Sequence, residues 1–281
     1  MRFRTLLFGL ILGASAFAAD TKAARPDAQA DSFRYDPRFR TPRFASVDEF
    51  VHVVESREAP WDILLQPEKS PDYDASAEVV APGALEVDVI RHSPAQAIVF
   101  AQYKANRTAP FSAVIFLLSQ KGDRWHVSDF IRRSVGYGSY SEISRPQMLK
   151  LRPTEHLHFY FTDFMGGRKW GVDTDEFYMV EGNRLRRTLL LKNDGAFISP
   201  ADPWREFSQS AQVSVASGRL HVRVLRTWGL ADGEEKKQGL AVTFRWDQRR
   251  KKFTSPSVGR LFVNDPKDWT SEGLPPPPAG E

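Results

Sequence analysis

A helical repeat of apolar residues occurs close to residue 50. The apolar positions follow the i, i+3, i+4, i+7 spacing that gives a helix one buried face, and they are Val47, Phe50, Val51 and Val54. Ser46 and Glu49 stand in the order of a capping box, so the helix begins at Ser46. It should end before Pro60, because the residue before a proline is pushed out of the helical conformation. We expect residues 61–65 to continue into the core.

Beyond about residue 76 the pattern changes to short segments rich in β-branched and aromatic residues, bounded by Gly, Pro, Asn and Asp. Residues 121–123, 181–183 and 247–249 are typical of hairpin turns. The predicted strands are Leu85–Arg91, Gln96–Lys104, Phe111–Ser119, Trp125–Ile131, Met148–Arg152, His156–Phe164, Glu176–Glu181, Leu185–Lys192, Gln212–Ala216, Arg219–Trp228, Leu240–Trp246 and Lys252–Ser255.

Two of these strands, Arg219–Trp228 and Leu240–Trp246, alternate apolar and polar residues, which indicates an antiparallel sheet packed on one face. Ala113–Leu118 is apolar throughout and predicts a central strand covered on both faces. Similar strand patterns start near residues 96, 156 and 219, which suggests about three four-stranded units; chance similarity among hairpins is the alternative. The predicted fold is mainly β, an antiparallel meander with one N-terminal α-helix.

The ends of the chain differ from this domain. Residues 1–18 combine a cationic start, an apolar run and a small-x-small end, which predicts a cleaved signal peptide; a membrane anchor is the alternative. The apolar run is shorter than the about 20 residues that a membrane span needs. We expect a flexible arm over 19–45, one β-rich domain over 46–263, and a proline-rich tail over 264–281. The arm could dock on the domain through Phe33, Tyr35, Phe39 and Phe44.

Charge and cysteine content then narrow the possible functions. The formal net charge is +4, but residues 1–18 carry Arg2, Arg4 and no acid, so removing them lowers Lys+Arg from 39 to 37 against 35 Asp+Glu and the charge to +2. This small excess argues against nucleic acid as a partner. The chain has no Cys, which excludes disulfides, thiolate metal sites and a thiol nucleophile. We therefore expect a periplasmic or secreted protein without stable membrane insertion.

Local catalytic motifs are missing from the sequence: it contains no G-x-S-x-G, H-E-x-x-H or P-loop pattern. This favours a non-enzymatic binding module, without a cofactor, whose partner is an envelope polymer or envelope protein. Two alternatives stay open, a structural subunit and a hydrolase acting on an envelope polymer. The hydrolase would need two facing carboxylates. Those eligible are Asp129, Glu142, Asp163, Asp175 and Glu176.

Aromatic and basic residues supply the candidate ligand-binding positions. Trp170, near Arg168, and Trp204 fall in predicted loops, where an exposed indole beside a guanidinium can hold a sugar ring or a peptide. Arg223 and Arg245 lie on the polar faces of two predicted strands. The alternative is that the loop aromatics fold back over the core.

Short basic runs occupy residues 132–133, 184–187 and 249–252. Basic residues at strand edges and turns hinder edge-to-edge association of sheets. If the turns converge, the same residues could instead contact anionic envelope components such as lipid head groups or wall polymers.

His156 and His158 are the candidate metal ligands. Residues i and i+2 of a strand point to the same side, so both imidazoles could meet one ion. Tyr160 continues that side, so the alternative is a solvated polar face.

Overall fold

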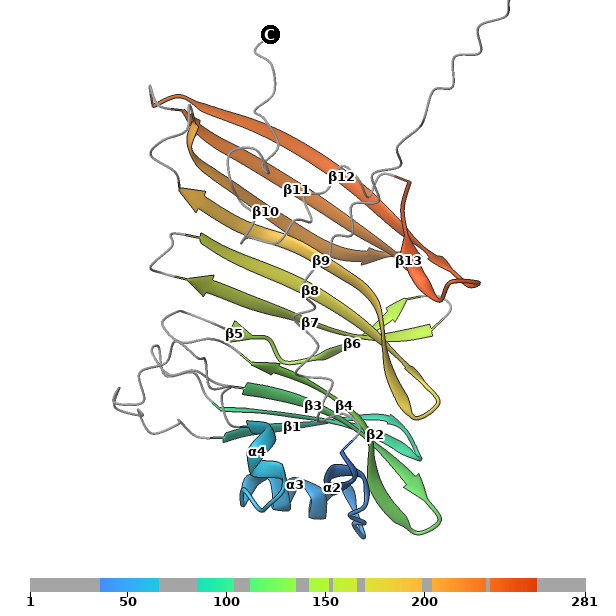
Figure 1. Cartoon of the computed structure of the whole chain (residues 1–281). Coiled ribbons are helices and arrows are strands. Elements are labelled where there is room, and N and C mark those ends of the chain that lie inside the picture. Colours follow the sequence, from blue (N-terminus) through green and yellow to red (C-terminus); the bar gives the residue numbers. More distant parts are fainter. Residues whose placement is uncertain are drawn as a thin grey trace, which may run out of the picture.

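The computed structural model describes residues 36–65, 85–103, 112–134, 142–151, 154–165, 170–198, 204–230 and 233–256. The predicted signal peptide, residues 19–35 of the predicted arm, Arg168 and the proline-rich tail lie outside them. The helices are α2 (Pro37–Arg40), α3 (Val47–Glu55) and α4 (Trp61–Leu65) (Figure 1). The strands are β1 (Leu85–Ser93), β2 (Gln96–Tyr103), β3 (Ser112–Lys121), β4 (Arg124–Ser134), β5 (Glu142–Ile143), β6 (Gln147–Leu151), β7 (Thr154–Met165), β8 (Trp170–Glu181), β9 (Arg184–Ile198), β10 (Trp204–Ala216), β11 (Arg219–Leu230), β12 (Glu235–Asp247) and β13 (Lys252–Thr254).

All strand pairs are antiparallel and nearly all join consecutive strands, which confirms the predicted meander. Sheet A has the order β1-β2-β3-β4. Sheet B has nine strands: β13 to β7 follow one another in order, and β5 and β6 both pair with β7. The three predicted units correspond to β1–β4, β6–β9 and β10–β13. The second and third are joined into sheet B through β9 and β10.

The predicted helix is α3, and its cap follows the sequence closely. The Ser46 hydroxyl accepts from the Glu49 amide at 3.1 Å, while the Glu49 carboxylate accepts from the Ala45 amide, one residue earlier than in the usual capping box. Val47, Phe50 and Val54 are buried. Two short helices, α2 and α4, flank it.

Helix α2 lies in the segment predicted to be a flexible arm, and residues 36–45 are instead part of the domain. Asp36 caps α2 by accepting from the Arg38 amide at 2.9 Å, and Pro37 suits the first helical position. Phe39 is fully buried. Phe44 forms a β-bridge to Trp125, with both backbone bonds between 2.8 and 2.9 Å. The two docking phenylalanines are confirmed.

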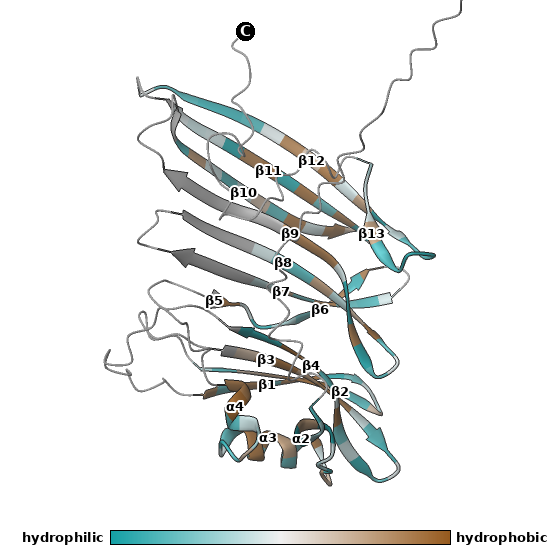
Figure 2. Cartoon of the chain, viewed as in Figure 1, coloured by the Kyte–Doolittle hydropathy of each residue, from teal (hydrophilic) through white to brown (hydrophobic). Residues whose placement is uncertain are grey.

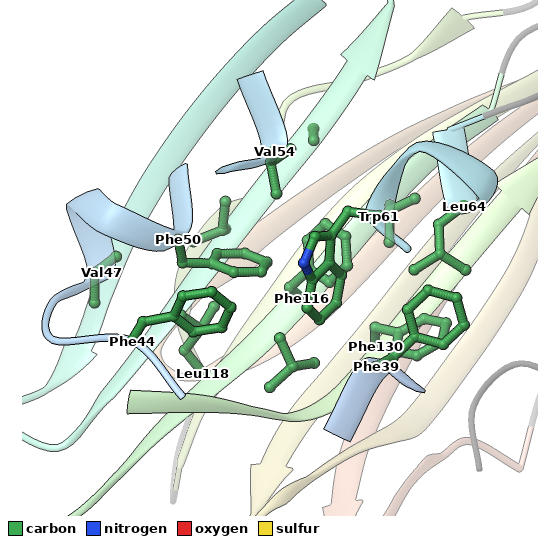
Figure 3. Close-up of a cluster of buried hydrophobic side chains, with 14 of the residues drawn as sticks. Phe39, Phe44, Val47, Phe50, Val54, Trp61, Leu64, Phe116, Leu118 and Phe130 are labelled. Atoms are coloured by element: carbon green, nitrogen blue, oxygen red, sulfur yellow. The ribbon is translucent and has the colours of Figure 1, made fainter. Parts of the chain in front are cut away.

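The three helices cover one face of sheet A with an aromatic core (Figure 3). The Phe116 ring of β3 lies 5.1 Å from Phe50, 5.8 Å from Trp61 and 6.1 Å from Phe130, centroid to centroid. The other face of β3, carrying Ile115, packs on sheet B. Ala113–Leu118 is thus covered on both faces, as predicted.

Sheet B curls back on itself. His156 of β7 packs on Trp246 of β12 and Phe253 of β13, with ring centroids 5.1 and 4.9 Å apart, although these strands are far apart in the strand order. β9 and β10 pair only between residues 195–198 and 206–209 and then diverge. Apolar residues of β6, β8, β9 and β11–β13 fill the inside of the curl. In the described part of the chain, no helix has the length and apolarity needed to cross a membrane.

Candidate functional site

Two turns rich in Arg and Lys meet at one end of the molecule. Glu181, the last residue of β8, accepts hydrogen bonds from Lys251 in the β12–β13 turn and from Arg186 of β9, the latter at 3.0 Å. Arg186 also reaches the Arg250 carbonyl at 3.4 Å. Lys251 and then Arg186 hold the pKa of the Glu181 carboxyl below its usual value. The two basic runs therefore gather around a shared carboxylate.

A pocket of about 320 Å³ opens beside this contact, at the junction of the two sheets. It is bordered by the end of α2, the start of β4 and the β8–β9 turn. Gly182 opens that turn with a φ of 58°, a conformation that glycine adopts without strain. The lining residues are Arg40, His126, Val127, Ser128, Glu181, Asn183 and Arg184.

A β-bulge at Ser128 shapes the pocket wall. Leu117 pairs with Asp129 and Leu118 with Val127, so Ser128 has no partner across the ladder. Its hydroxyl instead bonds the Leu117 carbonyl at 3.0 Å. The bulge directs the Asp129 carboxylate, 1 % exposed, to sheet B, where it accepts from the Leu185 amide at 2.7 Å.

The same carboxylate lies behind a pocket arginine. Arg40 Nη2 is 3.9 Å from Asp129 Oδ1, so α2, sheet A and sheet B are connected at the base of the pocket. A second connection is made by Gln96, whose side-chain amide donates to the Gly182 carbonyl at 2.7 Å. The pocket walls are therefore held by buried or cross-sheet hydrogen bonds.

His126 contributes an imidazole to the pocket wall. Burial, then the nearby Arg43 guanidinium, lowers its pKa, and Lys121 adds to that shift. Its Nδ1 atom is buried and has no hydrogen-bond partner among the described residues.

We call this region the basic end. Its turns lie on the right of Figure 1, and Figure 2 shows them as hydrophilic. Acidic residues within it are Asp123, which is exposed, and Glu181 and Asp247, which are partly buried. Its basic residues are Arg40, Arg43, Lys121, Arg124, Arg184, Arg186, Arg249, Arg250, Lys251 and Lys252.

The predicted ligand-binding aromatics lie at the opposite end of sheet B. Trp170 and Trp204 were expected in loops, but they are the first residues of β8 and β10. Register places both at the same end of sheet B, because Phe197 pairs with Trp170 and also with Phe207, three residues after Trp204. β8 rises about 3.3 Å per residue, so Trp170 lies roughly 35 Å from Glu181.

Arg223 and Arg245 are exposed on one open face of β11 and β12, as the alternation predicted. The structure does not bring them to Trp170 or Trp204, since Arg223 is central on its strand and Arg245 is close to the β12–β13 turn. Their predicted role in ligand binding stays a prediction.

The two histidines share one side of β7, but that side is not a solvated face. His156 is fully buried, and burial lowers its pKa to about 4. His158 stacks on Phe177 at 4.6 Å, and its Nε2 lies 2.5 Å from Asp175 Oδ1. Among the described residues, no cluster of three or more His, Asp or Glu could hold a metal ion. Metal binding by His156 and His158 stays a prediction.

The carboxylates considered for hydrolysis hold other groups in place. Glu176 makes a two-bond ion pair with Arg133 of β4, at 2.7 and 2.5 Å, and accepts from the Tyr178 hydroxyl at 2.6 Å. Burial alone would raise the pKa of Glu176, but Arg133, Tyr178 and Arg187 together lower it. Asp129 and Asp175 are also engaged, as described above, while the side chains of Glu142 and Asp163 lie outside the description.

The sequence located the basic runs but not the pocket. The signal for the runs was their coincidence with predicted turns. The runs at 184–187 and 249–252 converge, as ligand contact requires. The run at 132–133 does not join them, because Arg132 donates to the Leu64 carbonyl and Arg133 pairs with Glu176 in the interior. Arg40, His126, Ser128 and Asn183 carry no local pattern that could have identified them. They meet only because the bulge at Ser128 and the β8–β9 turn bring the two sheets together.

Comparison with known proteins gives no match: no protein-family model, no curated protein and no solved structure is significantly similar to this chain.

Proposed function

We propose that this protein is an exported, non-enzymatic binding module whose basic end binds anionic groups of cell-envelope components. The observation that carries the proposal is the convergence of basic residues from α2, β4, the β8–β9 turn and the β12–β13 turn. Export rests on the cationic and apolar pattern of residues 1–18.

Edge protection accounts for only part of this surface. Residues 184–187 pair with β8, and β9 meets β10 only at residues 195–198, so one side of this basic run is an open strand edge. The β12–β13 turn adjoins the edge strand β13. Arg40 of α2 and Arg43, however, belong to no strand and protect no edge. Basic residues that gather on a shared surface raise the local positive potential, which attracts anionic partners.

The hydrolase alternative has less support. A general acid or base should be a carboxyl group poised to exchange protons near neutral pH. Glu176 is buried, its pKa is lowered, and its oxygens are occupied by Arg133 and Tyr178. We therefore favour binding over catalysis.

Vesicle binding tests the proposal. The purified protein should co-sediment with vesicles of phosphatidylglycerol and phosphatidylcholine in equal parts, weakly with phosphatidylcholine alone, and less as salt is added. Each basic residue near such a surface contributes about 1 kcal/mol, so Arg249→Gln/Arg250→Gln should weaken binding roughly thirtyfold.

The matched control is Arg57→Gln/Lys237→Gln, which removes the same charge from exposed positions outside the basic end. It should leave binding nearly unchanged. Equal losses in both double variants would show that only net charge matters, and no loss in the first would refute the proposal.

A further inference from the structure

We infer that the pocket at the basic end binds one phosphodiester group of a polyol, such as the glycerol phosphate unit of a lipid head group or of an anionic polymer. This inference rests on the proposed function and adds to it the chemistry that the surface selects. It concerns the pocket alone, whereas general attraction to anionic surfaces needs only the exposed turns.

The pocket has the size of one such group. Its volume of about 320 Å³ is at the lower end of the range found for small-molecule sites. A single head group fits this space, whereas a polymer chain must lie largely outside it along the basic turns.

Two arginines line the pocket from separate elements. Arg40 comes from the end of α2 and is backed by the buried Asp129 carboxylate, which limits its motion. Arg184 comes from the first residue of β9, directly after the turn residue Asn183. Guanidinium groups bind phosphate oxygens through paired, charge-assisted hydrogen bonds, and the amide of Asn183 adds a neutral donor. These donors suit a phosphate.

The same pocket also contains acceptors, which a bare phosphate would not use. Glu181 is kept ionised by Lys251 and Arg186, and a carboxylate has more acceptor sites than the two that these cations fill. A hydroxyl group next to the phosphate can donate to one of the remaining acceptor sites.

The Glu181 carboxylate also disfavours highly charged ligands. Like charges in a partly enclosed site repel, so a second negative charge on the ligand costs binding energy. A diester carries one negative charge, whereas inorganic phosphate near neutral pH carries between one and two. The pocket therefore prefers a polyol phosphodiester to inorganic phosphate.

Calorimetric titration with soluble probes tests the inference. Glycerophosphoglycerol should bind saturably, inorganic phosphate more weakly and glycerol not detectably. Arg184→Gln removes a charged hydrogen-bond donor and should weaken glycerophosphoglycerol binding by roughly tenfold to a hundredfold. Lys237→Gln, at an exposed position outside the pocket, should bind like the wild type. Arg184 is exposed, so the unfolding midpoint of the variant should stay unchanged.

Displacement then separates the two sources of the group. If glycerophosphoglycerol displaces the protein from phosphatidylglycerol vesicles, the pocket holds the lipid head group. If it binds without displacing the protein, the ligand is a soluble or polymeric polyol phosphate. Both outcomes support the inference.

Absence of saturable diester binding, or equal affinity for inorganic phosphate, would overturn it. Vesicle binding that persists in that case, and that is lost in Arg249→Gln/Arg250→Gln, would leave the proposed function standing. Loss of both would reject the proposed function as well.

Discussion

The buried ion pair between Glu176 and Arg133 allows a quantitative test of how the two sheets are held together. Arg133 belongs to β4 of sheet A and Glu176 to β8 of sheet B, and their side chains are 15 % and 4 % exposed. Glu176→Leu removes both oxygens that face the guanidinium. Arg133 is then left with a charge that is largely buried and has lost its strongest partner.

Removing one partner of a buried pair typically costs about 3–5 kcal/mol, so Glu176→Leu should lower the free energy of unfolding by that amount. Replacing both partners with apolar residues of similar size often costs little. The double variant Arg133→Met/Glu176→Leu should therefore be more stable than Glu176→Leu alone by about 2 kcal/mol or more.

Urea unfolding followed by tryptophan fluorescence measures these differences, because Trp61 and Trp228 are buried. Acid titration gives a second measure. The folded pKa of Glu176 lies below its ordinary value of 4.5, so the pair stabilises the fold above that pH and the stabilisation is lost as the pH falls through the folded pKa. The double variant should lack this loss. If the double variant were as unstable as the sum of the two single ones, the pair would not couple the sheets.

Three further predictions follow from the core and the site. Burial lowers the pKa of His156 from 6.5 to about 4, so the free energy of unfolding should fall by about 3 kcal/mol as the pH drops between these values. His156→Phe should lose less stability over the same range. Urea unfolding at several pH values measures this, and the same pH dependence in both proteins would contradict the burial argument. Phe116→Ala should lower the free energy of unfolding by about 3–5 kcal/mol, because the ring contacts three other aromatic side chains. A loss below about 1 kcal/mol in urea unfolding would mean that this core is loosely packed. Glu181→Gln should raise the affinity for inorganic phosphate relative to glycerophosphoglycerol in calorimetry, and an unchanged ratio would remove the carboxylate from the selectivity argument.

Local patterns predicted the elements of this fold well. Alternation at Leu220, Val222 and Val224 marked the face that is buried, and the apolar run at Ala113–Leu118 marked the strand covered on both sides. These patterns succeed because a strand alternates its side chains, so the environment of each face is written into consecutive residues. The turns at residues 121–123 and 181–183 succeed for a similar local reason.

Contacts between distant strands were beyond such patterns. His156 looks like part of a polar strand face, and only the curl of sheet B places it between Trp246 and Phe253. Likewise Phe39 lies in a proline-interrupted stretch, and its burial depends on the partners Trp61 and Phe130, at 5.5 and 5.7 Å. The pocket depends on three contacts between distant residues: Arg40 with Asp129, Asp129 with Leu185, and Gln96 with Gly182. Only its basic turns could therefore be predicted.

Hydrogen exchange with and without phosphatidylglycerol vesicles tests the central claim most directly, because it locates the bound surface along the chain. Turn amides exposed to solvent exchange quickly, and contact with a partner slows them. If the basic end binds the vesicles, they should slow exchange at residues 121–126, 181–187 and 247–252. The double variant Arg249→Gln/Arg250→Gln should reduce this protection. Protection confined to the strand starts at Trp170 and Trp204, at the opposite end of sheet B, would contradict it.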